Sequence, residues 1–187
     1  MKIAVDFDDV LSDFAGFMID AVRKEQGRVL TRESFKTYNL LETLSMTEQG
    51  LYYLLQNTRP LVNMKPIAGS QKAVEILRGK YDLVVVTNRP EDNIPKMKNW
   101  LNRYFPGSFS EILSTKTRTE TKKMTCNRIN AYALIDDYLF NFAGLRGTRS
   151  LLFEDWPYSR FEAGDVFGIF SHIERVKNWE EVVKKLM

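Results

Sequence analysis

The chain has 187 residues, of which 44% are hydrophobic and 27% are charged, and its formal net charge is +3. This composition is typical of a folded globular domain, and it excludes a disordered or fibrous chain. The length allows one domain with a full core, or a core domain with a small insertion. No apolar run is long enough for a transmembrane helix, and because an apolar strand begins almost at the N-terminus, we expect no signal peptide.

The chain contains one cysteine, Cys126, and one histidine, His172. A single cysteine permits no intrachain disulfide, which favours a reducing, cytoplasmic location. A single histidine argues against a histidine-rich zinc site and against a Ser-His-Asp triad. We therefore expect any acid–base chemistry to depend on carboxylates or lysines.

The first predicted element is a strand at residues 3–5, Ile-Ala-Val, which is apolar on both faces as in a parallel sheet. Three carboxylates follow it directly, those of Asp6, Asp8 and Asp9. Open α/β sheets bind ligands beyond the carboxyl ends of their strands, and grouped carboxylates there suit a hard cation such as Mg²⁺. Taken alone, the stretch also fits a solvated acidic turn.

Residues 12–64 are predicted to form a small helical cap, inserted after the first strand. Apolar residues from Phe14 onwards recur at helical spacing, and Gly27 is a suitable stop. Ser45 and Glu48 have the spacing of a capping box, which predicts a further helix. The insertion interrupts a strand–helix–strand alternation, so we assign residues 1–11 and 65–187 to an α/β core.

From residue 66 onwards, helices and strands alternate, which predicts a Rossmann-like α/β fold with a parallel sheet. Ser70 and Asn178 are expected to cap helices, and Trp156, Tyr158 and Trp179 to pack against the late strands. Further strands are predicted at residues 83–86, 111–113, 132–135, 150–153 and 166–170.

Basic residues concentrate between Lys116 and Arg128. A loop of this kind can collect phosphates, either on a small ligand or along a nucleic acid. More often, such a loop is simply a solvated surface.

Several polar side chains follow the predicted strands, and a pair of lysines lies one helix before the predicted strand at residues 132–135. Parallel strands deliver these groups to one edge of the sheet, where they can meet. Carboxylates with a cation, a hydroxyl and an ammonium together form a phosphate site. The residues are Asp6, Asp8, Thr87, Asn88, Lys122, Lys123, Asp136 and Asp137.

These residues resemble, in order, the four signature motifs of the haloacid dehalogenase (HAD) superfamily. The resemblance is closest to the 5′(3′)-deoxyribonucleotidase family within it, and it spans nearly the whole chain. A single Asp-x-Asp pair is weak support, but four motifs in order are strong support. The matching stretches are Asp6-Phe7-Asp8, Asp13-Phe14, Thr87 to Pro90, Lys122 with Cys126, Asp136-Asp137, Phe153 to Arg160 and Arg175 to Trp179.

The resemblance implies a HAD core with a cap and a Mg²⁺-dependent phosphomonoesterase, which hydrolyses nucleoside or deoxynucleoside monophosphates through an aspartyl-phosphate. Asp6 is then the nucleophile, and Asp8 protonates the leaving alcohol and later activates water. The implied ligands of Mg²⁺ are the side chains of Asp6 and Asp137 and the backbone carbonyl of Asp8, with Asp136 orienting them.

The resemblance also assigns the groups that hold the substrate. Thr87, Asn88 and Lys122 would bind phosphoryl oxygens, although the adjacent Lys123 is an alternative to Lys122. Phe14 would pack on the nucleobase, but an aromatic residue on an amphipathic helix is as often part of a core. Arg89 and Arg160 could bind substrate or pair with acids.

The sequence departs from the family pattern at two positions. Asp9 replaces a glycine that is common after the acidic pair, and it adds negative charge near the site. Asn141 stands where many members of the wider superfamily have another acid, which favours Asp136 as the carboxylate that orients the ligands.

Other functions stay open at this point. A phosphatase for nucleic-acid 3′ ends or for other small phosphoesters would use the same four motifs. A phospho-receiver domain also combines carboxylates, Mg²⁺, a hydroxyl and a lysine, but it has no cap and a different motif order. We expect the substrate to be a small phosphomonoester, with a nucleoside monophosphate as the leading candidate. We expect binding neither to a membrane nor to a nucleic acid, and a homodimer stays open.

Overall fold

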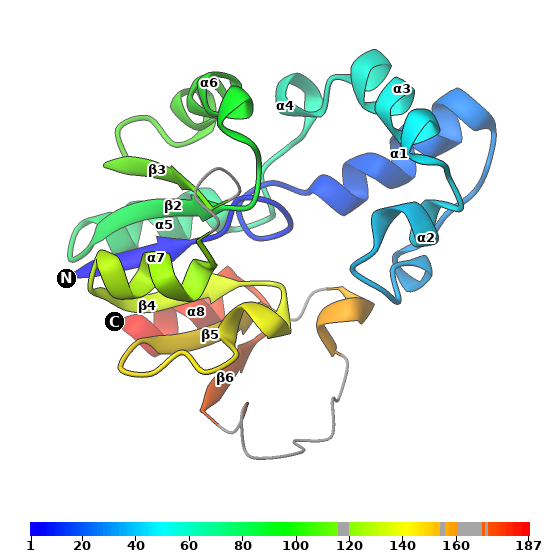
Figure 1. The fold of residues 1–187 in the computed structure, drawn as a ribbon. Coiled ribbons are helices and arrows are strands. Elements are labelled where there is room, and N and C mark those ends of the chain that lie inside the picture. The colour runs from blue at the N-terminus through cyan, green and yellow to red at the C-terminus, as the bar shows by residue number, and fades with distance from the viewer. Residues whose placement is uncertain (116–119, 154–155, 161–169, 171) are drawn as a thin grey trace.

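The computed structural model describes residues 1–115, 120–153, 156–160, 170 and 172–187. Its centre is a parallel sheet with the strand order β3-β2-β1-β4-β5-β6 (Figure 1). The chain builds outwards from β1 in one direction and then from β4 in the other, so a crevice forms where these two central strands end. The strands are β1 (Lys2–Val5), β2 (Asp82–Thr87), β3 (Glu111–Ser114), β4 (Ala131–Asp136), β5 (Arg149–Phe153) and β6 (Ile173–Val176).

Helices cover both faces of the sheet, and a separate group of helices lies beyond the ends of its strands (Figure 1). Short 3₁₀ turns lie at Arg32–Ser34, Glu91–Asn93, Leu139–Phe142 and Pro157–Arg160. The helices are α1 (Phe14–Gln26), α2 (Leu40–Leu44), α3 (Glu48–Thr58), α4 (Pro60–Asn63), α5 (Ser70–Arg78), α6 (Ile94–Tyr104), α7 (Lys122–Arg128) and α8 (Trp179–Leu186).

Side chains along each strand alternate between two apolar cores. Ile3 and Val5 of β1 point into a core that they share with α5, α6 and α8. Ala4, between them, points into a second core that contains Cys126 of α7. Both faces are therefore buried, and the α/β class with a parallel sheet is confirmed.

Helices α1 to α3 have a hydrophobic cluster of their own, which includes Met18, Leu44 and Leu54. The chain enters and leaves this region through two adjacent segments. The N–H of Asp13 donates to the carbonyl of Lys65 at 2.9 Å, and the N–H of Ile67 donates to the carbonyl of Leu11 at 2.9 Å. The helical insertion is thus joined to the sheet by a paired double crossing, and the boundaries 12–64 stay a prediction.

Several predicted elements hold and others need correction. The strand predicted at 166–170 lies outside the described residues except for Phe170, which is in a turn, and the observed last strand is β6. The N-cap of α3 is Thr47, whose hydroxyl accepts from the N–H of Gly50; the predicted cap Ser45 instead ends α2 at φ 49°. Gly69 precedes α5, whereas the Ser70 hydroxyl donates to the carbonyl of Ile67 at 2.6 Å.

Two predicted helix ends are confirmed. Gly27 ends α1 with φ 66°, a left-handed conformation that glycine adopts at little cost. Asn178 caps α8 by accepting from the N–H of Glu181. In the part of the chain that the structure describes, no helix has the length and apolar character needed to cross a bilayer.

Candidate functional site

Asp6 lies at the first position after β1, at the edge of the sheet that faces the helical insertion. Its side chain is buried, and its carboxylate is paired with the ammonium of Lys122 at 2.7 Å. Burial raises the pKa of Asp6 from 3.8 to about 7, because desolvation outweighs the opposing effect of Lys122, while Asp136 and Asp8 add repulsion. The site therefore favours an additional positive charge beside Asp6.

Lys122 is the first residue of α7, and its side chain is almost fully buried. Its ammonium lies 2.7 Å from Asp6 Oδ1 and 2.7 Å from Asp136 Oδ2. Burial lowers the pKa of Lys122, but the carboxylates of Asp136 and Asp6 outweigh this effect and raise it, so the ammonium stays charged. By contrast, the ammonium of Lys123 lies beside Gly144.

Asp136 is the last residue of β4 and Asp137 follows it, but the two have different surroundings. Asp136 uses both oxygens: Oδ2 accepts from Lys122, and Oδ1 accepts from the N–H of Tyr138 and the side-chain amide of Asn141, both at 2.9 Å. Asp137 Oδ2 accepts from the Tyr158 hydroxyl at 2.6 Å. Asp137 Oδ1 is buried and has no hydrogen-bond partner among the residues that the structure describes.

The carboxylates of Asp6, Asp136 and Asp137 each offer one oxygen within 4.8 Å of the others. Oxygen ligands of this kind are those that Mg²⁺ prefers. An unpartnered buried carboxylate oxygen is costly unless a cation or another donor meets it. The residues present therefore fit a divalent cation, and Asp137 has the open oxygen that Asp136 lacks.

Asp8 does not share this cluster through its side chain. Both of its oxygens accept from the guanidinium of Arg89, with distances of 2.7 and 2.8 Å. The same guanidinium lies 5.3 Å from the centre of the Phe14 ring. In this arrangement the Asp8 carboxylate is paired with Arg89, and its side chain is still partly exposed to the cavity. Arg89, whose role the sequence left open, is a direct neighbour of the site.

Thr87 and Asn88 end β2 beside these carboxylates. The Thr87 hydroxyl accepts from the N–H of Arg89 at 3.1 Å, which shapes the turn after the strand. The Asn88 amide oxygen accepts from the Thr115 hydroxyl, so the amide nitrogen is the group left for a ligand. The Thr115 hydroxyl also lies 3.3 Å from the carbonyl of Thr87, and it is a neighbour that sequence reasoning missed.

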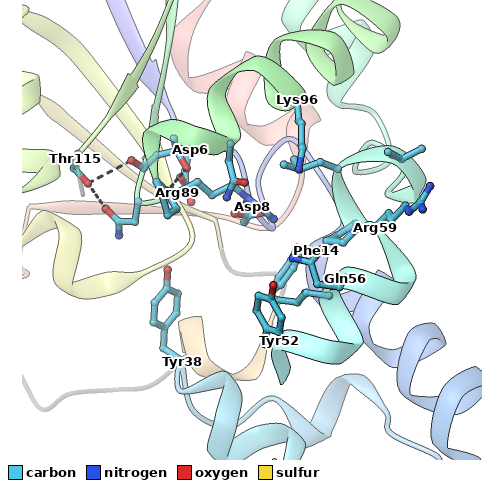
Figure 2. A pocket seen from close by; sticks show the side chains of 18 of the residues that line it. Asp6, Asp8, Phe14, Tyr38, Tyr52, Gln56, Arg59, Arg89, Lys96 and Thr115 are labelled. Carbon is cyan, nitrogen blue, oxygen red and sulfur yellow. Dashed lines mark hydrogen bonds and ion pairs between the residues drawn. The ribbon is translucent and has the colours of Figure 1, made fainter. Parts of the chain in front are cut away.

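A cavity of about 1150 Å³ joins these residues to the helical insertion. Asp6, Thr87 and Lys122 line it on the side of the sheet. Phe14 lines the opposite side, and Figure 2 shows it beside Gln56 and Tyr52, with the Tyr38 hydroxyl directed towards Asp6. The structure thus brings the predicted residues Asp6, Asp8, Phe14, Thr87, Asn88 and Lys122 to one cavity, with Asp136 and Asp137 behind Asp6.

Three predictions about neighbouring residues have different outcomes. Trp179 packs against Phe153, with ring centres 5.9 Å apart, as expected for the late strands. Trp156 and Tyr158 do not pack there; they lie in the hydrophobic cluster of α1 to α3. Residues 116–119 of the basic loop lie outside the described part, and so does the side chain of Arg160 in the turn after β5. Within that part, Arg128 pairs with Glu120 at 3.1 Å.

Comparison with known proteins places this arrangement in a family. A family model described as 5′ nucleotidase, deoxy (pyrimidine), cytosolic type C protein (NT5C) matches residues 1–187. Proteins named 5′(3′)-deoxyribonucleotidase from Bacillus subtilis (strain 168) and from Bacillus phage SPbeta are each 28% identical over 189 residues. Each match covers 99% of this chain and 98% of the relative.

Solved structures agree on the fold. A haloacid dehalogenase-like hydrolase from Streptococcus pneumoniae superposes with a TM-score of 0.68 at 15% identity, covering 100% of this chain and 98% of the other. The HAD hydrolase YfnB from Bacillus subtilis, solved with bound magnesium, has a TM-score of 0.66 at 17% identity, with coverages of 99% and 97%. The chain belongs to the NT5C family, and it is a HAD-type nucleotide phosphomonoesterase.

Proposed function

We propose that the protein hydrolyses nucleoside or deoxynucleoside 5′- or 3′-monophosphates in a Mg²⁺-dependent reaction, with Asp6 as the nucleophile. One observation carries this proposal. Asp6 lines a large cavity beside a buried ammonium, and it shares a carboxylate cluster with Asp137, one oxygen of which has no partner among the described residues. A carboxylate with these neighbours is placed to attack phosphorus while positive charge accepts the phosphoryl oxygens.

In the proposed reaction, Mg²⁺ would be held by the side chains of Asp6 and Asp137 and the backbone carbonyl of Asp8. When bound, it neutralises phosphate charge. Asp136 would keep Lys122 and the ligands in place, since both of its oxygens are already hydrogen-bonded. Lys122, Thr87 and the amide nitrogen of Asn88 would hold the phosphoryl oxygens.

The covalent steps use Asp6, Asp8 and one water molecule. A carboxylate oxygen of Asp6 forms a bond to phosphorus as the bond to the nucleoside oxygen breaks, and that oxygen takes a proton from Asp8. A water molecule then attacks the phosphorus of the aspartyl-phosphate and gives a proton to Asp8. The bond between phosphorus and the Asp6 oxygen breaks in this step, which releases phosphate and regenerates the Asp6 carboxylate. In the substrate-free structure Arg89 is paired with Asp8, and we propose that the incoming phosphate attracts the guanidinium and leaves Asp8 to exchange protons.

A phosphate-release screen tests the proposal. Purified protein is incubated with Mg²⁺ or with EDTA and a panel of 2′-deoxy- and ribonucleoside 5′- and 3′-monophosphates, with p-nitrophenyl phosphate as the general substrate. We expect catalytic, Mg²⁺-dependent release that is faster from nucleotides than from p-nitrophenyl phosphate. A panel in which p-nitrophenyl phosphate alone reacts would refute the nucleotide substrate, and a single turnover would point to a receiver domain.

We also propose that residues 12–64 act as the cap that closes over the substrate, with residues 1–11 and 65–187 as the core. The paired crossing at Leu11, Asp13, Lys65 and Ile67 supports this division, because a short double connection can act as a hinge. A cytoplasmic location fits the single buried cysteine. A homodimer is compatible with this function.

The two acids at the end of β4, Asp136 and Asp137, should respond differently to mutation. Asp137→Ala removes the open oxygen and is expected to raise the Mg²⁺ concentration for half-maximal activity by more than Asp136→Ala does. The measurement is a Mg²⁺ titration of phosphatase activity for each variant, with thermal unfolding to confirm that both fold. If Asp136→Ala shifts the Mg²⁺ requirement more, the two roles must be exchanged.

Stability without metal should fall as the pH rises. The folded-state pKa of Asp6 is about 7, above its ordinary 3.8, so this group stabilises the fold at low pH. That contribution is lost between about pH 4 and pH 7, and it amounts to roughly 4 kcal/mol at most. The free energy of unfolding in EDTA should therefore decline over this range. Asp6→Asn should make the free energy of unfolding depend less steeply on pH. An unchanged pH dependence in that variant would contradict the raised pKa of Asp6.

Phe14 tests the base contact. Its ring lines the cavity and is half-buried, so it can stack on a nucleobase. Phe14→Ala is expected to raise KM for deoxynucleoside monophosphates about ten- to a hundredfold, the effect of losing one stacked aromatic, while p-nitrophenyl phosphate is much less affected. Equal losses with both substrates would show that Phe14 is core packing.

A second candidate substrate is the phosphorylated end of a short oligonucleotide. The cavity is also lined by Arg59 and Lys96, which pair with no acid among the described residues, and by the exposed ring of Tyr52. Cations beside an aromatic surface suit a second nucleotide unit. The test compares kcat/KM for a mononucleotide with that for a phosphorylated dinucleotide, in the wild type and in Arg59→Gln/Lys96→Gln. An oligonucleotide substrate requires a higher kcat/KM for the dinucleotide than for the mononucleotide in the wild type, and the double variant should lose this difference.

A further inference from the structure

Tyr158 connects two parts of the molecule that are far apart in the sequence. It lies in the 3₁₀ turn after β5 (orange in Figure 1), yet its ring belongs to the hydrophobic cluster of α1 to α3. Its N–H donates to the carbonyl of Phe35 at 2.9 Å. The neighbouring Trp156 packs on the Phe35 ring, with centres 5.2 Å apart, and on the guanidinium of Arg32 at 4.1 Å. Residues 156–158 are therefore anchored in the helical insertion.

The hydroxyl of Tyr158 reaches the carboxylates behind the nucleophile. It lies 2.6 Å from Asp137 Oδ2 and 3.2 Å from Asp9 Oδ2. Asp9 Oδ1 in turn accepts from the N–H of Ala15 in α1 at 2.8 Å, so Asp9 is tied to the insertion as well. Burial, together with Asp137 and Asp9, raises the pKa of Tyr158, so its hydroxyl stays a donor at neutral pH.

This contact leaves Asp137 with one oxygen held and one open. Oδ2 is fixed by Tyr158, and Oδ1 is the atom without a partner among the described residues. Rotation of the carboxylate would exchange the two oxygens, and the tyrosine hydroxyl opposes that rotation. Mutation of a group that hydrogen-bonds to a metal ligand commonly lowers metal affinity 10- to 100-fold.

We propose that Tyr158 is a positioning residue that fixes Asp137 for the divalent cation and makes cation affinity depend on how the helical insertion is packed. This inference rests on the proposed metal site. It predicts that a mutation inside the helical insertion alters cation binding at Asp137. It also predicts that this effect depends on the Tyr158 hydroxyl.

The first test is calorimetric titration of the substrate-free protein with Mg²⁺, and with Mn²⁺ detected by electron paramagnetic resonance. Tyr158→Phe removes the hydroxyl and keeps the ring in its cluster, and it should weaken cation binding about 10- to 100-fold. The matched control is Tyr138→Phe. Tyr138 is adjacent to Asp137, stacks on Tyr38 at 3.9 Å, and donates no hydrogen bond through its hydroxyl to a described residue. The control should bind like the wild type.

The second test separates positioning from general loosening. Phe35→Leu weakens the packing against Trp156 and leaves every carboxylate in place. We expect it to lower cation affinity by less than Tyr158→Phe does. In the double variant it should lower affinity no further, because the connecting hydroxyl is already absent. Thermal unfolding of each variant shows that the proteins are folded during the titration.

The outcomes are distinct. A wild-type protein that binds no Mg²⁺ would refute the proposed metal site itself. A wild type that binds Mg²⁺, with a folded Tyr158→Phe variant that binds equally well, would overturn only the role of Tyr158. An effect of Phe35→Leu that is the same with and without the hydroxyl would overturn the connection to the insertion.

Discussion

Replacing Asp6 by asparagine is expected to abolish phosphatase activity while the fold is kept. The change is nearly isosteric, but an amide oxygen is a poor nucleophile, and loss of a nucleophile usually lowers kcat by several orders of magnitude. We expect a decrease of roughly 10⁴-fold or more, with nucleotides and with p-nitrophenyl phosphate alike. The two substrates should fail together because Asp6 reacts with phosphorus and not with the base.

Steady-state kinetics in saturating Mg²⁺ measure this loss, and circular dichroism with thermal unfolding tests the fold. Mass spectrometry of the purified variant excludes reversion of the amide to the acid. Asp82→Asn is the matched control, because Asp82 is an exposed aspartate at the opposite end of the sheet, 3.8 Å from Lys2. Near-normal turnover by a folded Asp6→Asn protein would remove Asp6 from the mechanism.

The sequence predicted the sheet well because buried parallel strands have a strong local pattern. The apolar runs at β1, β2, β4 and β5 are too short for typical helices, and each strand lies where it was expected. β6 was missed because Ile173–Val176 contains two charged residues in four and is an edge strand, half-buried, without an apolar run. Short edge strands depend on their neighbour more than on their own residues.

Helix starts were less predictable, because several residues near a boundary can serve as a cap. Ser45 and Thr47 are both good capping residues, and the observed choice depends on where α2 ends. Asp9 shows a different limit. Its φ of 55° is in the left-handed region, which explains why glycine is common there, but the sequence did not reveal that its carboxylate would accept from Ala15.

The members of the site were predictable because each follows a strand or begins a helix, and parallel strands end at one edge. The contacts among them were not. Arg89 and Asp8 are 81 positions apart, and Tyr158 and Asp137 are 21 apart, so no local pattern reports either pair. Tyr158 was misplaced because an aromatic that follows a strand was expected to pack on the sheet beside that strand. Instead it packs in the hydrophobic cluster of the insertion.

Lys122 carries the second large expected effect. In the structure the Lys122 ammonium lies 2.7 Å from the carboxylates of both Asp6 and Asp136. Lys122→Met leaves these two carboxylates buried without that ammonium. Removal of one partner from a buried charge pair costs about 3–5 kcal/mol. We expect a loss of that size in the free energy of unfolding without metal, measured by urea denaturation. Activity should fall about 10²- to 10³-fold, since one charge that stabilises the phosphoryl oxygens is lost.

Lys123→Met is the control that decides between the two lysines. Its ammonium lies beside Gly144, so its loss should change stability by no more than about 0.5 kcal/mol and leave kcat/KM nearly unchanged. The double variant Lys122→Met/Asp136→Asn separates stability from catalysis. Removing a second buried charge should recover part of the lost stability, yet activity should stay low, because no ammonium faces the phosphate. Recovery of activity along with stability would show that Lys122 serves the fold alone. A large loss of activity in Lys123→Met would assign the phosphate contact to Lys123.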